Sequence, residues 1–314
     1  NIDGSGLLAH YIDCAQTCEP VVLDAFPYYN EVLDSACYYD VRAKQVRPGW
    51  MALTWRDVTE RFEMTERIAR SERQLTEELS SAAAYVASTL PDDLDGAVRV
   101  SSRFVPSRFL GGDSYDYRWI DDDHLTAYLI DVSGHGVGPA LMSVSVHNLL
   151  RSGTLEPETL LHPDEVLTEL NRLFQMEQHG GNYFTVWYGV YQASTRTLRF
   201  ASAGHPPALV FTAGRLAGQL STNAIPIGVF EETEFVTGGY VVPPESDILL
   251  YSDGAFELTP PDGFGYWTLA GFIEVCARAA AGTWTLDALI ADLLAHSESG
   301  VFEDDCTLVR LTID

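Results

Sequence analysis

The sequence predicts an α+β fold in which two packed antiparallel sheets are covered by helices, preceded by a smaller sheet and a long helix. Strand-like alternation dominates after residue 97, and helical periodicity there occurs in pairs of segments between runs of strands. A doubly wound parallel sheet would instead alternate strand and helix along the chain. The length of 314 residues is enough for about two domains.

The first 57 residues predict a small sheet. A short helix is expected over 7–18, followed by strands over 21–24, 36–46 and 50–57. The dipeptide Pro48-Gly49 predicts the turn between the last two strands. This segment is too short to look like a whole domain.

Residues 58–90 predict a long, charged helix, because the segment contains neither Gly nor Pro and Pro91 follows it. Apolar residues recur there at alternating spacings of seven and four: Ile68, Leu75, Leu79, Val86 and Leu90. This seam is typical of a coiled coil, so we expect a linker that pairs in a homodimer, although Thr65 and Glu72 are polar at seam positions. The alternative is a spacer helix that covers the C-terminal domain.

Residues 91–314 predict one domain rich in antiparallel strands. Strands are expected over 98–104, 115–120, 125–132, 184–192, 198–202, 208–212, 235–242, 247–252 and 306–313, and helices over 140–151, 163–178, 269–280 and 286–297. The three consecutive acids from Asp121 to Asp123 predict an exposed hairpin tip between the second and third of these strands.

The balance of charge excludes several partners. The chain carries 19 basic and 45 acidic residues, a net charge of −26, with Lys44 as its only lysine. Such a chain has no broad cationic surface, so neither nucleic-acid binding nor contact with an anionic membrane is expected. No apolar run approaches the roughly 18 residues of a membrane-spanning helix, and we expect no secretory leader.

The cysteines indicate a reducing compartment. Their number is odd and their spacing is not that of a zinc site: Cys14, Cys18, Cys37, Cys276 and Cys306. We therefore expect reduced thiols and a cytoplasmic location.

Carboxylates next to glycines mark four separate segments of the C-terminal domain. Their sequences are FLGGDSYD (109–116), LIDVSGHG (129–136), ILLYSDGAFE (248–257) and EDDCTLV (303–309). In three of them an apolar strand abuts the acid, so burial of the strand fixes where the carboxylate points. Mg²⁺ and Mn²⁺ prefer oxygen ligands, and four such strand ends at one edge of a sheet pair would form a two-metal centre.

Each segment alone is a weak signal, because an acid followed by Gly at a strand end is most often a turn. Gly111, Gly112, Gly134 and Gly136 suit either interpretation, since glycine supplies positive φ in turns and in binding sites alike. His205 in AGHPP is equally compatible with a packed loop and with a substrate groove.

The order of the segments is far more specific. Seven blocks follow one another: GGDSYDY, DVSGHGVGPALM, NYFTVWYGV, AGHPPAL, IPIGV, LLYSDGAFE and DDCTLV. Together they resemble the SpoIIE-like (RsbU/RsbP-like) branch of bacterial PPM-type serine/threonine phosphatases over residues 104–311. The resemblance implies an α-β-β-α sandwich, two Mn²⁺ or Mg²⁺ ions, and hydrolysis of phosphoserine or phosphothreonine on a protein by metal-activated water.

Site residues are carried over by their positions in these blocks. Asp131 resembles the acid that bridges both metals, with the Val132 carbonyl as an additional ligand. Asp253 and Asp304 resemble the other ligands of the first metal, and Asp113 the acid that holds the second metal or its waters. The resemblance therefore implies catalytic roles for Asp131 and Asp113.

Two neighbouring residues are assigned less clearly. Asp305 follows Asp304, but in the wider family only the first of this pair is consistently a ligand. His135 lies four residues after Asp131, whereas the broader type 2C enzymes place their proton donor two residues after the bridging acid. A general-acid role for His135 therefore does not follow from the resemblance.

The N-terminal segment resembles the C-terminal part of a PAS sensor domain. The resemblance rests on 21–24, on 38–42 and above all on ALTWRDVTER (52–61), which is similar to the exit of such domains, where the Asp ties the sheet to the following helix. It implies control of the phosphatase by a sensor through the helical linker. The phosphatase resemblance implies as substrate a phosphorylated anti-sigma factor antagonist, a small STAS-type protein of a partner-switching pathway.

Two other functions fit parts of the sequence. A non-catalytic PAS and coiled-coil scaffold with a phosphatase-like binding domain would have no reason to keep acids at all four positions. Nucleotide cyclase chemistry is suggested by Gly111-Gly112-Asp113, but Ser114-Tyr115 replace the acidic and aromatic pair of that signature. A metal-dependent phosphatase is the leading interpretation.

Overall fold

Two units make up the chain, Asn1–Glu78 and Leu79–Asp314. The computed structural model describes residues 6–30, 34–107, 110–260, 267–282 and 284–314, so Phe109 in the first acidic segment lies outside the described residues. Within these ranges, none of the helices combines the length and the hydrophobicity needed to cross a membrane.

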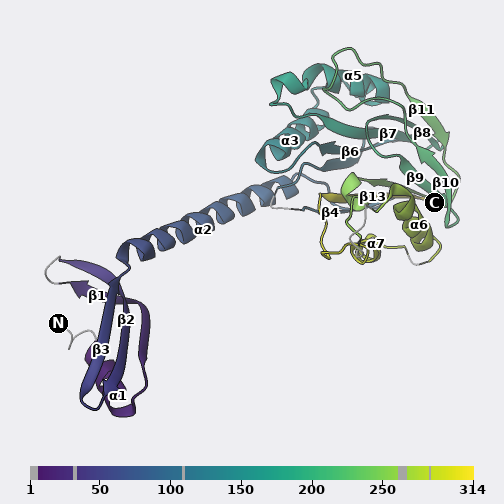
Figure 1. Ribbon diagram of the computed structural model, residues 1–314. Coiled ribbons are helices and arrows are strands. Elements are labelled where there is room, and N and C mark those ends of the chain that lie inside the picture. Colours follow the sequence, from purple (N-terminus) through teal and green to yellow (C-terminus); the bar gives the residue numbers. More distant parts are fainter. Residues whose placement is uncertain (1–5, 31–33, 108–109, 261–266, 283) are drawn as a thin grey trace. The chain divides into compact units, whose positions relative to one another are not determined.

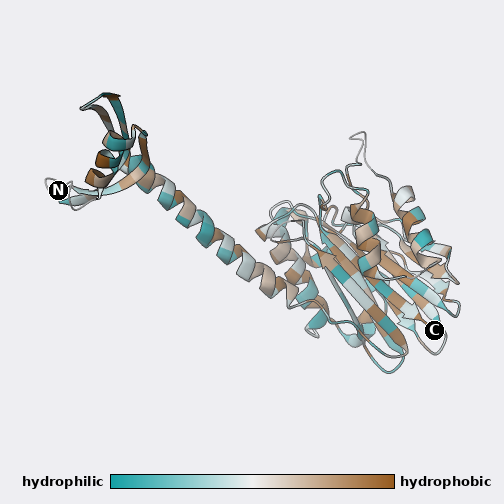
Figure 2. Cartoon of the chain, turned by 90° about the horizontal axis from the view of Figure 1, so that it is seen from below, coloured by the Kyte–Doolittle hydropathy of each residue, from teal (hydrophilic) through white to brown (hydrophobic). Residues whose placement is uncertain are grey.

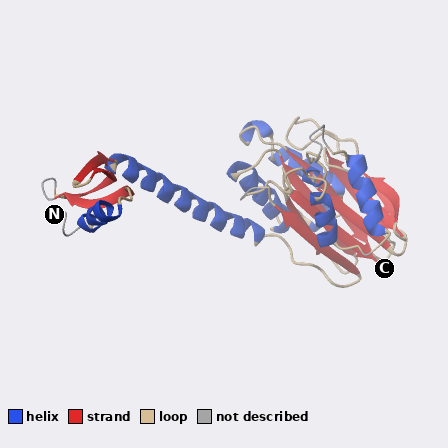
Figure 3. Cartoon of the chain, turned by 60° about the horizontal axis from the view of Figure 1, so that its bottom comes forward, coloured by secondary structure: helices blue, strands red, loops and turns tan. Residues whose placement is uncertain are grey.

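The N-terminal unit contains a three-stranded antiparallel sheet in the order β1 (Val21–Asn30), β2 (Ser35–Arg47), β3 (Trp50–Asp57). The helix α1 (Leu7–Thr17) packs against this sheet (Figures 1 and 3). Their shared core consists of Leu7, Tyr11, Cys14, Val41 and Ala43. The three strands and the helix are those that the sequence predicts.

β1 is longer than predicted. The hydrophobic alternation stops at Asp24, whereas the strand continues to Asn30. A register shift between Leu23 and Phe26 interrupts the ladder with β2, and Ala25 there has a φ of 46°. Such a bulge breaks the two-residue period on which the prediction relied.

The long helix α2 (Thr59–Ala87) is joined to the sheet by side chains on both sides of its start. Asp57 Oδ1 accepts a hydrogen bond from Thr59 N at 2.9 Å, and Thr59 Oγ1 accepts one from Tyr38 N at 2.9 Å. Arg61 forms an ion pair with Asp40 at 3.1 Å. Asp57 thus caps the helix, whereas Thr59 and Arg61 are the residues that tie the helix to β2.

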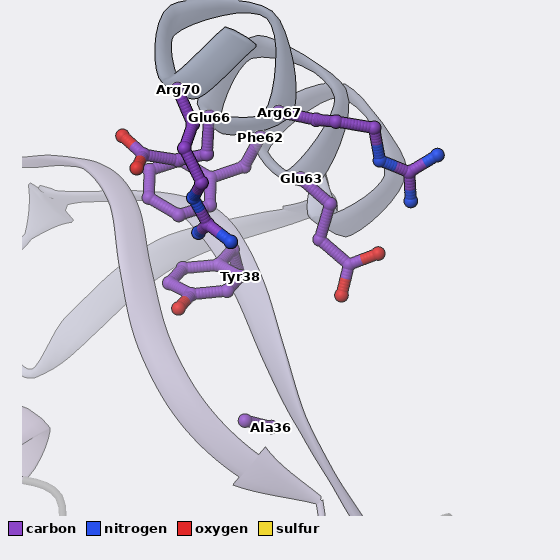
Figure 4. A pocket seen from close by; sticks show the side chains of 7 residues that line it. All are labelled: Ala36, Tyr38, Phe62, Glu63, Glu66, Arg67 and Arg70. Atoms are coloured by element: carbon purple, nitrogen blue, oxygen red, sulfur yellow. The ribbon is translucent and has the colours of Figure 1, made fainter. Parts of the chain in front are cut away.

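An aromatic stack lies beside this junction. Phe62 stacks on Tyr38 with ring centroids 3.9 Å apart (Figure 4). The pocket around the stack is lined by Ala36 and by two acids and two arginines: Glu63, Glu66, Arg67 and Arg70. The formal charges of these four side chains cancel.

The predicted seam of α2 is exposed over much of its length. Ile68 and Leu75 are 51% and 57% exposed, and hydrophilic residues are spread along the helix (Figure 2). The helix ends at Ala87 and not at Leu90 as predicted, because Thr89 N and Leu90 N form turn hydrogen bonds to the carbonyl three residues earlier. Leu90 packs instead against the core of the C-terminal unit.

Two five-stranded sheets form the centre of the C-terminal unit, and all neighbouring strands within them are antiparallel. The first has the order β10 (Arg215–Leu220), β9 (Ala208–Thr212), β12 (Ser246–Tyr251), β13 (Cys306–Ile313), β4 (Val98–Val105). The second has the order β11 (Gly238–Val241), β8 (Thr197–Ala203), β7 (Phe184–Gln192), β6 (His124–Val132), β5 (Ser114–Trp119).

Helices cover the outer face of each sheet (Figures 1 and 3). A core between the sheets contains residues of both, such as Leu129 and Val309. A second core lies between the second sheet and three helices, α3 (Val137–Arg151), α4 (Pro157–Leu160) and α5 (Pro163–Leu173). A third core lies between the first sheet and two helices, α6 (Leu269–Ala280) and α7 (Leu286–Leu294). This arrangement is the predicted α-β-β-α sandwich.

Local differences from the prediction have local causes. β10 was not predicted, because it is an edge strand with mostly exposed side chains and lacks hydrophobic alternation. α4 was missed because one helical turn is too short to show a period. The helix expected over 163–178 stops at Leu173, and the short helix η1 (Met176–Gln178) follows it. There Met176 N donates to Gly228 O of a distant loop instead of continuing the helix.

Candidate active site

The second sheet brings two of the predicted acids side by side. Ser114 of β5 pairs with Ile130 of β6, so the ladder places Asp113 next to Asp131 at its end. Asp131 pairs on its other side with Thr185 of β7. Because directly paired residues project from the same face of a sheet, these three side chains form one row.

The other two acids lie at the corresponding end of the first sheet. Tyr251 of β12 pairs with Leu308 of β13. Asp253 begins the short helix η2 (Asp253–Ala255) directly after β12, and Asp304 lies just before β13. All four acidic segments therefore meet at one end of the sandwich.

A hydrogen bond joins the two sheets at this end. Thr307 Oγ1 of β13 donates to Asp113 Oδ2 at 2.5 Å. Thr307 is held in turn by its own backbone, since Thr307 N donates to Ser252 Oγ at 2.9 Å. Asp113 is 1% exposed, and within the described part of the chain its Oδ1 has no hydrogen-bond partner.

Two glycines allow the acidic segments to approach closely. A Cβ on Gly112 would lie 2.6 Å from the Val132 carbonyl oxygen, and one on Gly254 would lie 2.3 Å from the Asp305 carbonyl oxygen. Both distances are far below van der Waals contact. A larger residue at either position would therefore push apart the backbones that carry the acids.

Burial and mutual repulsion raise the pKa values of all four acids. Desolvation raises the pKa of Asp113 and of Asp131 well above the usual range, and the charge of Asp131 raises that of Asp113 further. The pKa of Asp253 is raised to about 6, first by desolvation and then by Glu257 and Asp304. Partial desolvation also raises the pKa of Asp304. Carboxylates that act on one another in this way hold an excess of negative charge that a cation would offset.

The donors suit a hard divalent cation. They are carboxylate oxygens, and the unpartnered Asp113 Oδ1 is a buried acceptor of the kind that such a cation engages. Within the described residues, however, no group of three or more His, Cys, Asp or Glu side chains is arranged to hold a metal ion. The structure thus gathers the expected ligand residues at one end of the sandwich, and their binding of metal stays a prediction.

Asp305 differs from its neighbour Asp304. Asp305 is 3% exposed, and its carboxylate accepts hydrogen bonds from Ser107 N, Ser107 Oγ and Gly112 N. Asp304 is exposed, and its Oδ1 accepts from Asp305 N at 2.7 Å. Of this pair, Asp304 is therefore the one whose side chain remains accessible to a ligand.

His135 lies in the loop that follows Asp131. The loop turns through Gly134 and Gly136, whose φ values of 87° and 97° lie in the positive range that favours glycine. His135 is exposed, and a positive charge on its ring would oppose the rise in the pKa of Asp304 that desolvation causes. Its position near this acid does not by itself assign it a proton-transfer role.

His205 is a packed loop residue. It is 7% exposed, and its Nδ1 lies 3.0 Å from Pro206 O. Burial lowers the pKa of His205 to about 4, so the ring is neutral near pH 7. The structure favours the packed-loop interpretation over the substrate groove.

Two threonines next to the acids were not predicted as site residues. One is Thr307, which bonds to Asp113, and the other is Thr185, whose buried Oγ1 has no hydrogen-bond partner within the described part of the chain. Both lie inside the blocks DDCTLV and NYFTVWYGV. A single Thr in a strand, however, is explained equally well by β-propensity.

Comparison with known proteins assigns the family. The family described as Stage II sporulation protein E (SpoIIE) matches residues 121–314, which is more than half of the chain. The chain belongs to the SpoIIE family.

Two curated relatives of this SpoIIE-family chain come from Bacillus subtilis. Phosphoserine phosphatase RsbP is 32% identical over 166 residues, which are 52% of this chain and 40% of RsbP. Phosphoserine phosphatase RsbU is 25% identical over 169 residues, which are 54% of this chain and 49% of RsbU. The chain thus spans less than half the length of either relative.

A solved structure shares the fold. The SiaA-PP2C domain of Pseudomonas aeruginosa superposes with a TM-score of 0.68 at 19% sequence identity, covering 78% of this chain and 100% of that domain. This match confirms the α-β-β-α sandwich of the SpoIIE-family unit. The similarity of residues 1–57 to a PAS domain stays a prediction.

Proposed function

We propose that this SpoIIE-family chain is a metal-dependent protein serine/threonine phosphatase that hydrolyses phosphoserine or phosphothreonine. The observation that carries the proposal is the meeting of Asp113, Asp131, Asp253 and Asp304 from four separate segments, all with raised pKa values. The names of RsbP and RsbU as phosphoserine phosphatases support the same chemistry.

Each acid has a role in this proposal. Asp131 would contact both of two Mn²⁺ or Mg²⁺ ions, with the Val132 carbonyl as a further ligand. Asp253 and Asp304 would hold the first ion and Asp113 the second. Such a pair of ions would supply an activated water and offset the charge of the phosphoryl oxygens.

The chain's own residues prepare this site. Thr307 fixes the orientation of Asp113, and the close approach at Gly112 and Gly254 sets the spacing of the backbones. A cysteine nucleophile is not needed, and Cys306 is poorly suited to be one. Its thiol is buried, and desolvation, followed by the charge of Asp113, raises its pKa well above the usual range.

A metal-dependence assay tests the activity. We expect hydrolysis of p-nitrophenyl phosphate with Mn²⁺, little hydrolysis with EDTA, and no conversion of GTP or ATP to cyclic nucleotides. Asp131→Ala and Asp253→Ala should abolish turnover while circular dichroism shows an intact fold. Unchanged turnover in either variant would reject the assignment, and an inactive wild-type chain would favour the non-catalytic scaffold.

We infer that the substrate is a phosphorylated anti-sigma factor antagonist of STAS type, as the resemblance to RsbU and RsbP implies. The net charge of −26 gives no long-range attraction to a phosphoprotein, so a local docking surface must provide selectivity. The folded phosphoprotein should be dephosphorylated with a higher kcat/KM than a phosphoserine peptide from it. Equal values would contradict this substrate class.

We further infer that a PAS-like sensor region regulates the enzyme through α2 and that α2 pairs with a second copy. The exposed Ile68 and Leu75 support pairing. Light scattering of the full chain should give a dimer at micromolar concentration, and Ile68→Glu or Leu75→Glu should give a monomer. Ser80→Glu is the matched control, since Ser80 is exposed and lies on the side of the helix away from the seam. A monomeric wild-type chain would exclude the dimer.

A further inference from the structure

We propose that Asp305 is a positioning residue that holds the loop carrying Asp113 against the strand end carrying Asp304, and that metal affinity depends on this contact. The inference rests on the proposed function, because it concerns how the metal-binding residues are kept in place. It assigns to Asp305 a structural task distinct from metal ligation.

Both carboxylate oxygens of Asp305 accept hydrogen bonds from other parts of the protein. Oδ1 accepts from Ser107 N at 2.9 Å and from Ser107 Oγ at 3.2 Å, and Oδ2 accepts from Gly112 N at 2.7 Å. Ser107 lies 198 residues away in sequence and Gly112 lies 193 residues away. A carboxylate that is only 3% exposed needs such donors, because an unpaired buried charge is costly. These three hydrogen bonds therefore attach the Asp305 side chain to the loop between β4 and β5.

The bond to Gly112 acts directly on the site. Gly112 N donates to Asp305, whereas Gly112 O accepts from Val132 N at 3.4 Å. The residue after Gly112 is Asp113. Gly112 is thus held at its N–H by the Asp305 carboxylate and at its carbonyl by Val132 N. The carboxylate of Asp305 therefore fixes the position of the backbone from which the Asp113 side chain extends into the site.

The backbone of Asp305 contacts the other half of the site. Its carbonyl oxygen accepts from Ser252 Oγ at 2.9 Å, and Gly254 packs so closely that a Cβ there would lie 2.3 Å from this oxygen. Asp253 lies between these two residues. Side chain and backbone of Asp305 therefore link the segments of Asp113 and Asp253.

Gly111 shows how tightly the loop fits this carboxylate. A Cβ on Gly111 would lie 2.4 Å from Asp305 Oδ2. The φ of Gly111 is not in the left-handed region, unlike those of Gly134 and Gly136. Gly111 is thus required by space and not by backbone conformation, which makes Gly111→Ala a way to displace Asp305 without removing its charge.

Mn²⁺ titration by calorimetry, on the full chain freed of metal, tests the inference. Asp305→Asn is nearly isosteric, but its amide cannot accept from both Ser107 and Gly112. Replacing a residue that holds metal ligands in place typically weakens metal affinity by about 10- to 100-fold. We therefore expect Mn²⁺ binding to weaken by that factor. Gly111→Ala should weaken it similarly, which separates positioning from loss of charge and keeps the test valid if Asp305→Asn fails to fold.

Asp247→Asn is the matched control. Asp247 also clamps β12 to β13, but at the opposite end of these strands, where it accepts from Arg310 Nε at 2.8 Å and Thr312 Oγ1 at 2.7 Å. It should lower the melting temperature without changing Mn²⁺ affinity. A general loss of stability would weaken Mn²⁺ binding in Asp247→Asn as well. A positioning role weakens Mn²⁺ binding only in Asp305→Asn and Gly111→Ala.

The outcomes separate the two proposals. If wild type binds Mn²⁺ and both Asp305→Asn and Gly111→Ala bind it with unchanged affinity, the role of Asp305 is overturned while the proposed function stands. If Asp247→Asn weakens binding as much as Asp305→Asn, the effect is general and the role of Asp305 is again overturned. A wild-type chain that binds no Mn²⁺ overturns the proposed function and this inference together.

Discussion

Thr307 Oγ1 donates a hydrogen bond to Asp113 Oδ2 at 2.5 Å, and this bond connects strands of two different sheets. Its acceptor is almost fully buried, and the other oxygen of that carboxylate has no hydrogen-bond partner among the described residues. The Thr307 hydroxyl thus fixes the orientation of the Asp113 carboxylate.

Thr307→Val should reduce metal-dependent phosphatase activity by about 10- to 100-fold, because Asp113 loses the group that orients it. The free energy of unfolding should fall by roughly 1 to 3 kcal/mol, the usual cost of an unsatisfied buried polar group. Thr307→Ser keeps the hydroxyl and should retain most of the activity. Steady-state kinetics and urea unfolding measure both effects, and equal kcat for the Val and Ser variants would contradict the orienting role.

Asp131→Asn should raise the thermal stability of the metal-free protein while activity is lost. Asp131 is destabilised by desolvation and by the charges of Asp253 and Asp304, so removing its own charge relieves repulsion. Thermal unfolding in EDTA should show a higher melting temperature than wild type, and added Mn²⁺ should stabilise wild type more than the variant. A lower melting temperature in EDTA would show that the carboxylate is not under electrostatic stress.

The contribution of Asp253 to the stability of the metal-free protein should fall as pH rises from about 4 to about 6. The folded pKa of Asp253 is about 6 and its usual value is 3.8, so the folded state holds the proton more tightly than the unfolded state in this window. Asp253 therefore makes the free energy of unfolding decrease with increasing pH, whereas His205, whose pKa is lowered to about 4, acts in the opposite direction. Urea unfolding in EDTA across this range measures the slope, and Asp253→Asn should shift it toward stability that rises with pH. The same slope in wild type and variant would remove Asp253 as its source.

Gly112→Ala should disrupt the site, because its Cβ would meet the Val132 carbonyl oxygen at 2.6 Å. We expect a loss of about 1 to 3 kcal/mol of stability, as in other overpacked sites, and at least a tenfold loss of activity. Gly239→Ala is the control, since a Cβ there has no neighbour within 4 Å. Activity assays and urea unfolding of both variants test this, and a fully active Gly112→Ala would refute the close approach.

Arg151→Met should destabilise the C-terminal unit by about 1 to 2 kcal/mol, less than the loss of a fully buried pair, because the Arg151 side chain is 43% exposed. Asp116 is 1% exposed, and Arg151 Nε lies 3.4 Å from its Oδ2. Removing the half-exposed Arg151 leaves the charge of the buried Asp116 less compensated, which costs more than losing both charges. The double variant Arg151→Met/Asp116→Asn should therefore recover most of the loss in urea unfolding. A double variant no more stable than Arg151→Met would contradict this pairing.

Much of the fold could be predicted from periodicity. β7 and β13 have the bounds that alternation predicts, since their side chains pack in the sandwich. The edge strand β10 and the end of α2 could not be predicted, because exposed side chains show no hydrophobic period and the turn after Ala87 depends on how Leu90 packs. Burial, which leaves a pattern in the sequence, is what made the central elements predictable.

The candidate site divides in the same way. The order of its acidic blocks predicted Asp113, Asp131, Asp253 and Asp304 as site residues through the family resemblance, because residue types and their spacing are properties of the sequence itself. Which of two adjacent carboxylates turns inward was decided by the tertiary structure alone. Asp305 is buried because Ser107 N and Gly112 N, nearly two hundred residues away, point at it, and no local pattern encodes a donor supplied by a distant backbone.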